Sequence, residues 1–256
     1  MQNFTSTRQV YFLMQAVLGG ELYALLKKHG KFTEPQAKFY VAQVAAVFEH
    51  LHTKDIIFRD LKPENLLIAR DGYLRVVDFG LAKKVPEGAK TYTLCGTPAY
   101  AAPEVYASAG HNKGVDWWTL GVLLHELLAG YTPFYGNEPN QISKEIKRFS
   151  KHFPKIAFPS NFSDAASELL MGLLNPKPAS RLGNLYAGAE GVKAATFFAD
   201  VNWPALIQKQ VAAEIIPKIN DAFDTQNFQA DKDKTFELVI DKDDESNEHE
   251  PWASIF

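Results

Sequence analysis

The sequence is poor in cysteine: Cys95 is the single one among 256 residues, which excludes an internal disulfide and fits a reducing compartment. It contains no apolar run close to the ~18 residues of a membrane span, and residues 1–8 lack the apolar segment of a signal peptide. The formal net charge of −3 gives no bulk signal for nucleic acid or a membrane surface. With 46% hydrophobic residues, the chain is predicted to be a globular cytoplasmic protein with no nucleic-acid partner and no membrane span.

Hydrophobic periodicity predicts an α+β chain that is mainly helical. Residues 10–14 are β-branched and aromatic and predict a buried strand that ends before Gly19 and Gly20. The segment Thr33–Gln36 (TEPQ) predicts a capping box at the start of a long helix. The remaining predicted elements are a helix at 21–29, strands at 65–68 and 74–77 joined by an Asp71-Gly72 turn, and a central buried helix at 117–128.

The chain becomes polar and loses its periodicity after Trp203. Residues 241–245 form a solvated acidic stretch, and the chain ends in the apolar segment Trp252–Phe256. This profile predicts a tail that lies on a domain and not a second domain. Residues 83–103 also lack periodicity, and a loop of that length inside a domain is usually functional.

Three motifs carry the functional signal: Phe58–Asn65 (FRDLKPEN), Asp78–Gly80 (DFG) and Ala102–Glu104 (APE). Each is weak alone, but their order and spacing resemble the catalytic loop, the metal-binding loop and the Ala-Pro-Glu motif of protein kinases. The resemblance implies the protein-kinase fold, here chiefly its C-terminal lobe, and transfer of the γ-phosphate of ATP.

The same resemblance implies the catalytic residues Asp60, Lys62 and Asn65. Asp60 is expected to accept the proton of the substrate hydroxyl or to orient it, and Lys62 to place a positive charge on the transferred phosphate. Asn65 and Asp78 offer the hard oxygen ligands that Mg²⁺ prefers, so ATP and Mg²⁺ are the implied cofactors. Lys62 also marks serine/threonine specificity in kinases of this kind. The alternative is that Asp60 and Asp78 are only turn-capping carboxylates.

Residues 91–100 (TYTLCGTPAY) narrow the resemblance to the AGC group, in particular to its cyclic-nucleotide-dependent kinases. In that group the threonine that matches Thr93 is phosphorylated, and Arg59 and Lys83 match the cations that receive the phosphate. The alternative is that Thr93 is merely a loop hydroxyl. The resemblance also implies three structural residues: Asp116, which holds the catalytic-loop backbone, and the buried pair of Arg181 with Glu104.

The resemblance runs from about Phe4 to Phe256. It implies a catalytic domain at 1–198, made of a hinge strand and the C-terminal lobe with a truncated N-terminal lobe, and an AGC-type tail at 199–256. The ending is closest to cGMP-dependent protein kinases, with the cAMP-dependent catalytic subunits close behind. The chain holds no cyclic-nucleotide-binding domain, so a regulatory domain or subunit upstream is an implied partner.

Nucleotide and substrate positions also follow from the resemblance. The implied ATP-binding residues are Met14 as gatekeeper, Val17 in the hinge, Glu21, Glu64, Leu67, Val77 and Phe228. The implied substrate residues are Glu21, Glu64 and Glu126, which would pair with arginines before the acceptor, and Leu94 and Pro98, which would line an apolar pocket after it. The predicted partners are therefore proteins with basic residues before the serine or threonine. Ala99 replaces the usual glutamate and weakens this preference, and a solvated acidic face is the alternative.

A complete kinase covers the ATP phosphates with a glycine-rich loop, a strand lysine and a helix glutamate, whereas the first glycine here is Gly19 and the first lysine is Lys27. Without that cover the site loses apolar burial, phosphate-binding amides and exclusion of water, so this chain alone is predicted to show little or no kinase activity. Three hypotheses remain open: part of an active kinase, a scaffold that binds basic peptides without MgATP, or an unrelated metal-dependent hydrolase that uses Asp60 and Asp78.

Overall fold

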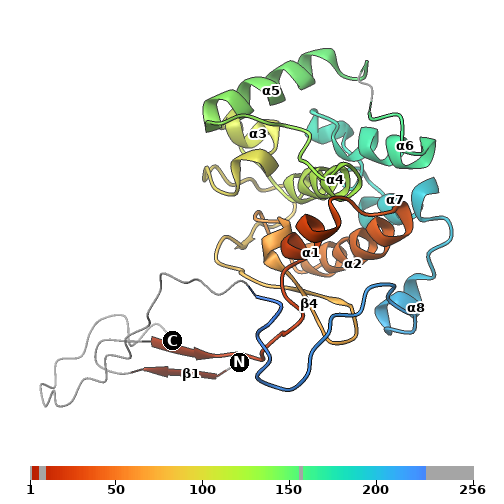
Figure 1. The fold of residues 1–256 in the computed structure, drawn as a ribbon. Coiled ribbons are helices and arrows are strands. Elements are labelled where there is room, and N and C mark those ends of the chain that lie inside the picture. Colours follow the sequence, from red (N-terminus) through yellow and green to blue (C-terminus); the bar gives the residue numbers. More distant parts are fainter. Residues whose placement is uncertain (1, 6–9, 156–157, 229–256) are drawn as a thin grey trace, which may run out of the picture.

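The computed structural model describes residues 2–5, 10–155 and 158–228. An antiparallel hairpin of β1 (Gln2–Thr5) and β2 (Val10–Leu13) precedes a body that is mainly helical (Figure 1). The body contains α1 (Leu22–His29), α2 (Glu34–His52), α3 (Pro103–Tyr106), α4 (Gly114–Ala129), α5 (Pro139–His152), α6 (Asp164–Leu173), α7 (Gly188–Lys193) and α8 (Trp203–Ile207). The predicted α+β, mainly helical class is confirmed.

The first predicted strand forms as β2, but the prediction that it is buried is wrong at its end. Leu13 is 58% exposed and Met14, the expected gatekeeper, is 65% exposed. The physical reason is the arrangement in Figure 1: β2 pairs with β1 in a hairpin that projects from the helical body. Strand β1 was not predicted, because four residues of mixed polarity carry no period-2 signal of their own.

The long helix α2 begins with the predicted capping box. The Oγ1 of Thr33 accepts a hydrogen bond from the backbone N–H of Gln36 at 3.4 Å, and the Gln36 side chain accepts one from Thr33 N–H at 3.1 Å. Helix α2 packs on α4, which is buried on nearly every side, as its apolar sequence predicts. Helix α4 therefore forms the centre of the body, with Trp117 and Trp118 fully enclosed.

Two short antiparallel ribbons hold the ends of the loops that carry the motifs. Strand β3 (Ile56–Ile57) pairs with β6 (Lys83–Lys84), and β4 (Leu66–Ile68) pairs with β5 (Leu74–Val76), which confirms the predicted hairpin. The catalytic loop runs from β3 to the 3₁₀ turn η1 (Pro63–Asn65), and the Asp78–Gly80 motif lies between β5 and β6. The other 3₁₀ turns are η2 (Pro98–Tyr100), η3 (Pro178–Ser180) and η4 (Thr196–Phe198).

After α8 the chain lies against the β4–β5 hairpin and the hinge, as the predicted tail should. The Tyr73 hydroxyl donates to the carbonyl of Val211 at 2.7 Å, and the Arg70 guanidinium donates to the carbonyl of Asp221 at 2.8 Å. The Asn227 side chain then donates to the carbonyl of Leu18 at 3.0 Å. The predicted acidic stretch and apolar ending lie outside the described residues, and the division at residue 198 stays a prediction.

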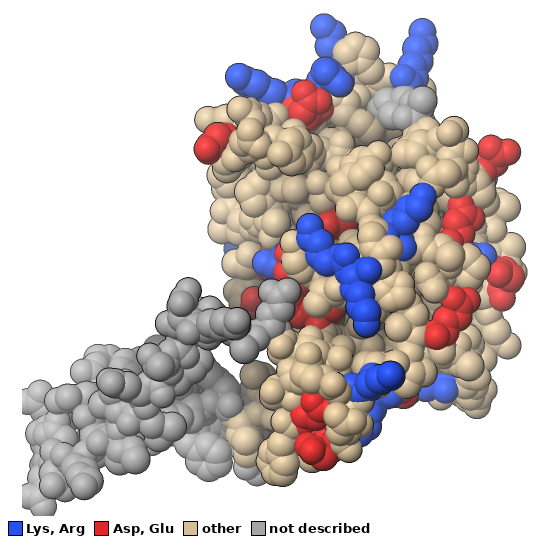
Figure 2. All heavy atoms as spheres, in the orientation of Figure 1, with Lys and Arg blue, Asp and Glu red and all other residues tan. Residues whose placement is uncertain are grey.

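Basic side chains gather over α5 at the top of Figure 2, where Lys144, Lys147, Arg148 and Lys151 are exposed. Acidic and basic groups are interspersed over the rest of that face (Figure 2). Within the described ranges, no helix combines the length and the apolarity that crossing a bilayer requires.

Replacing Gly183 by alanine is expected to destabilise the body. Gly183 has a φ of +85°, and an added Cβ would meet the Trp117 ring at 2.4 Å. Gly88 provides the matched control, because its φ of +80° imposes the same backbone strain while its surroundings are open. We expect Gly183→Ala to lose about 1–3 kcal/mol more unfolding free energy than Gly88→Ala in urea titrations. Equal losses would show that the Trp117 contact adds nothing.

Candidate active site

Asp116, at the start of α4, fixes the backbone of the catalytic loop. Its carboxylate accepts the backbone N–H of Phe58 and that of Arg59, both at 2.9 Å, and lies 2.8 Å from the Nε2 of His52. Asp116 is fully buried, so these hydrogen bonds form away from water. Arg59 itself has a φ of 69°, a conformation that a non-glycine residue rarely adopts unless its surroundings hold it.

The loop held in this way presents a cluster of polar side chains around Asp60. One carboxylate oxygen of Asp60 accepts the Thr97 hydroxyl at 2.9 Å. The other accepts the Lys62 ammonium and the Asn65 amide, each at 3.0 Å. The structure therefore brings the three predicted catalytic residues together, and it adds Thr97, which the sequence did not single out. A carboxylate with donors on both oxygens has its orientation fixed before substrate arrives.

Asp78 lies two residues after β5, next to Val77, which bonds to the Asn65 backbone. The N–H of Val77 donates to the carbonyl of Asn65 at 3.0 Å, which ties the two loops together. One Asp78 oxygen accepts the N–H of Gly80 at 3.1 Å, and Asp78 is exposed. Because Asn65 uses its Nδ2 for both side-chain hydrogen bonds that it makes within the described part of the chain, its Oδ1 is left as an acceptor. One amide oxygen and one carboxylate fit a hard cation such as Mg²⁺.

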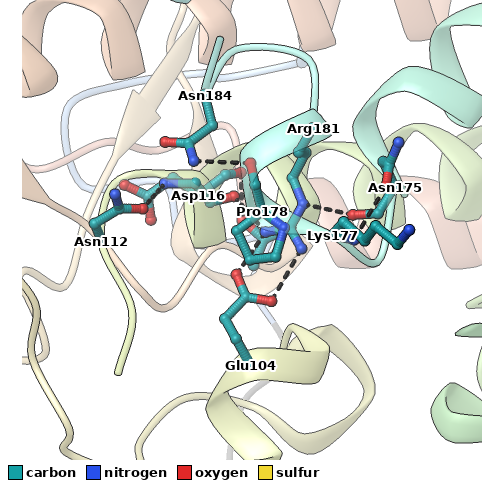
Figure 3. Close-up of polar contacts among 10 residues, drawn as sticks. Glu104, Asn112, Asp116, Asn175, Lys177, Pro178, Arg181 and Asn184 are labelled. Atoms are coloured by element: carbon teal, nitrogen blue, oxygen red, sulfur yellow. Dashed lines mark hydrogen bonds and ion pairs between the residues drawn. The ribbon is translucent and has the colours of Figure 1, made fainter. Parts of the chain in front are cut away.

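The Arg181–Glu104 pair anchors the other side of the site (Figure 3). Arg181 is completely buried and donates to both Glu104 oxygens, at 2.6 and 2.9 Å. It also donates to the carbonyls of Gly114, at 2.8 Å, and Asn175, at 2.9 Å. The expected ion pair is thus present, and it joins the Ala102–Glu104 motif to the start of α4.

The family model described as "Protein kinase domain" matches residues 1–198. The chain belongs to the protein kinase family. It is 44% identical to a cAMP-dependent protein kinase catalytic subunit of Arthrobotrys oligospora, over 94% of this chain and 46% of the relative. It is 41% identical to a cAMP-dependent protein kinase catalytic subunit of Dictyostelium discoideum, over 100% of this chain and 38% of the relative.

A further relative is mouse cGMP-dependent protein kinase 2, which is 40% identical over 89% of this chain and 29% of its own length. The resemblance to AGC-group kinases is therefore confirmed. The chain spans about half the length of the curated relatives it matches, from 38% to 59% of the first three.

The residues implied for ATP binding fall into two sets, those close to the hinge and Met14, which lies apart from them. Leu67 pairs with Glu21 in an isolated antiparallel bridge. Val17, in the hinge segment that precedes Glu21, is half-buried. Val77 and Phe228 are also half-buried, and the Asn227 backbone approaches Gly20 of the hinge closely. Met14 lies apart as an exposed side chain at the end of the β1–β2 hairpin. The structure thus brings the hinge next to β4 and the tail and leaves Met14 apart, and a role of these residues in binding ATP stays a prediction.

Two of the three acidic residues implied for substrate, Glu64 and Glu126, meet beside η2. The Tyr100 hydroxyl donates to the Glu126 carboxylate, and Glu64 lies close enough to affect both groups electrostatically. Burial raises the pKa of Glu126; the neighbouring Glu64 raises it further, while Tyr100 and Lys27 act in the opposite direction. Sequence reasoning missed Tyr100, because a tyrosine three residues past Thr97 has no chemical signature of its own. Glu21 lies immediately before α1 and pairs with Leu67.

The activation segment exposes the expected phosphorylation site. Thr93 is exposed, as are Leu94, at 68%, and Pro98. Lys83 donates to the hydroxyl of Thr91 at 3.0 Å, and the Nε of Arg59 donates to the carbonyl of Leu81 at 2.7 Å. Lys83 therefore contacts the segment that carries Thr93, and Arg59 lines a small cavity together with Gly96 and Thr97 of that segment.

Proposed function

We propose that this chain forms the catalytic half of a serine/threonine protein kinase that transfers the γ-phosphate of ATP to proteins with basic residues before the acceptor. The observation that supports it is the cluster of Asp60, Lys62 and Asn65, held by hydrogen bonds from a loop whose backbone Asp116 fixes. Phosphoryl transfer depends mainly on positioning and charge stabilisation, which such a rigid polar cluster supplies.

Asp60 is the base in this mechanism. Its carboxylate would accept or orient the hydroxyl proton of the substrate, and a positioned base of this kind typically contributes ~10²–10⁴-fold in rate. Lys62, which lies 3.0 Å from Asp60, would offset the charge on the transferred phosphate. Thr97, bonded to the opposite carboxylate oxygen, would keep Asp60 facing the acceptor.

Asn65 and Asp78 would hold Mg²⁺, because their free oxygens match its ligand preference. The bound ion would neutralise charge on the ATP phosphates. The Asn65 side chain has a second task, since its Nδ2 also holds the Asp60 backbone carbonyl at 2.8 Å. Cyclic-nucleotide control, a regulatory domain or subunit upstream and a cytoplasmic location are proposed from the same family membership.

Kinase turnover by the 256-residue chain alone is expected to be negligible, because its sequence contains no glycine-rich motif to cover the ATP phosphates. The test is a chimera in which the glycine-rich lobe of a cAMP-dependent kinase is joined ahead of β2. We expect the chimera to phosphorylate an arginine-containing serine peptide with MgATP. A folded chimera that binds MgATP but never transfers phosphate would contradict the proposal.

The exposed hairpin end at Leu13 and Met14 favours a second candidate, a scaffold that binds basic peptides without catalysis. Calorimetry separates the two functions. Peptide binding by the 256-residue chain together with an inactive chimera would favour the scaffold, whereas an active chimera would favour the kinase.

Peptide binding is expected to depend on pH through Glu126. Its pKa lies above the usual value because of burial and Glu64, and only the ionised carboxylate pairs well with arginine. Affinity for an arginine-containing peptide should therefore rise as pH increases through that raised pKa. Glu126→Gln should cost about 1.5–3 kcal/mol of binding and flatten the pH profile, whereas Glu168→Gln, exposed on α6, should change neither. An unaltered profile in calorimetry of Glu126→Gln would assign the dependence to another group.

A further inference from the structure

A buried histidine lies directly behind the activation segment. His111 is 4% exposed and belongs to the loop between α3 and α4. Its backbone pairs with that of Thr91 in both directions, Thr91 N–H to His111 C=O at 2.9 Å and His111 N–H to Thr91 C=O at 2.8 Å. Residues directly opposite in an antiparallel bridge place their side chains on one face. The His111 imidazole therefore shares a face with the Thr91 hydroxyl, which already contacts the Lys83 ammonium.

The same region contains a guanidinium nitrogen without a partner. The Nη1 of Arg59 is buried and has no hydrogen-bond partner in the described part of the chain. A small cavity beside it is lined by Arg59 and His111, together with Gly96 and Thr97 of the activation segment. A buried charged donor without an acceptor is costly, so its presence points to an acceptor that another state of the protein supplies.

The charged groups around His111 are unbalanced. Burial lowers the pKa of the His111 imidazole, and Arg59 and Lys83 lower it further, whereas Glu104 and Asp116 raise it. Glu104 is already paired with Arg181, and the Asp116 carboxylate is held by hydrogen bonds from the catalytic-loop backbone. Arg59 and Lys83 have no such carboxylate partner among the described ion pairs. The cluster of Arg59, Lys83 and His111, here called the cation cluster, therefore lacks an anion.

We propose that His111 is the third cationic member of the site that receives the phosphate of Thr93, so that phosphorylation of Thr93 and protonation of His111 favour each other. The inference rests on the proposed function, in which Thr93 is the phosphorylation site. Thr93 is two residues from Thr91, so a phosphate on its exposed side chain can turn towards the face that Thr91 shares with His111. A phosphate supplies up to two negative charges and three acceptor oxygens for the three cations.

Linkage fixes the sign of the effect. In the unphosphorylated chain the pKa of the His111 imidazole is lowered, because burial and two cations oppose its charge. A phosphate beside it reverses the balance and raises the pKa of His111. Coupling is reciprocal, so protonation of His111 also favours the phosphorylated state. The stability that phosphorylation adds should be fully present below the pKa that His111 has in the unphosphorylated chain. It should fall as pH rises through the higher pKa that His111 has in the phosphorylated chain.

The test compares the 256-residue chain with the same chain carrying genetically encoded phosphothreonine at position 93. NMR titration of the imidazole signals is expected to show that the His111 pKa rises by at least about one unit, a tenfold change in proton affinity. His125 is the internal control, because it is also buried but lies in a separate aromatic group with Tyr131 and Phe162. A His111 shift no larger than that of His125 would overturn the proposal.

A variant gives a second readout. The gain in Tm on phosphorylation is expected to increase as pH falls in the unaltered chain, and His111→Gln should abolish this increase and leave only the titration of the phosphate itself, whose second pKa is about 6. A gain that keeps its full pH dependence in His111→Gln would overturn the inference. The side-chain signals of Arg59 and Lys83 separate two kinds of failure. If the signals of Arg59 and Lys83 shift on phosphorylation while that of His111 does not, only the inference about His111 fails. If none of the three signals shifts, these cations do not bind the phosphate on Thr93, and that part of the proposed function fails too.

Discussion

Replacing Arg181 by alanine is expected to lower the free energy of unfolding by about 3–5 kcal/mol. The side chain is completely buried and makes four hydrogen bonds, two to Glu104 and one each to the carbonyls of Gly114 and Asn175 (Figure 3). Its loss would leave the Glu104 carboxylate 7% exposed and without its countercharge. Most of the expected cost comes from that uncompensated charge and not from the lost attraction.

Urea denaturation followed by tryptophan fluorescence measures the effect, since Trp117 and Trp118 lie in the adjacent core. The matched control is Arg148→Ala on α5, whose ion pair with Glu145 at 3.5 Å is exposed. It should change the unfolding free energy by less than about 0.5 kcal/mol. The double variant Glu104→Leu/Arg181→Met should recover most of the loss, because it removes both charges together. A loss below about 1 kcal/mol in Arg181→Ala would show that water reaches Glu104.

The elements that the sequence predicts well are those whose signals are local. The capping box of α2 uses residues three apart, the β4–β5 hairpin is marked by Asp71-Gly72 between two short apolar runs, and α4 is apolar on all sides. Each signal involves neighbours along the chain, so no knowledge of the tertiary fold is needed. The catalytic cluster was predicted through the family resemblance, and its members Asp60, Lys62 and Asn65 lie within one loop.

Contacts between distant segments could not be derived in this way. Asp116 lies 58 residues beyond Phe58, whose N–H it accepts, and only the family resemblance predicted that contact. Nothing predicted the pairing of Thr91 with His111 or the hydrogen bond from Tyr100 to Glu126. The burial of Met14 was predicted wrongly for the same reason: an apolar strand is buried only if another element covers it, and β2 pairs with β1 in a projecting hairpin.

In the chimera that carries a glycine-rich lobe, Asp60→Asn is expected to reduce kcat by about 10²–10⁴-fold. The amide cannot accept a proton from the substrate hydroxyl. Three donors now face the Asp60 carboxylate, from Thr97, Lys62 and Asn65. The amide of the variant side chain would turn its own N–H group towards one of them and lose that hydrogen bond. The KM for ATP should change little, because Asp60 contacts none of the hinge residues in the described structure.

Two measurements make this result specific to chemistry. Thermal unfolding of the Asp60→Asn chimera should stay within a few degrees of the parent, since the change is isosteric and Asn65 keeps its bond to the residue-60 carbonyl. Glu168→Gln, an exposed carboxylate on α6, supplies the control for loss of one negative charge and should leave kcat unchanged. A stable Asp60→Asn chimera that keeps more than about a tenth of the parent kcat would remove Asp60 from the role of base. Catalysis would then depend on the positions of Lys62 and Asn65 and on the phosphate-covering lobe, with the substrate hydroxyl losing its proton directly to the transferred phosphate.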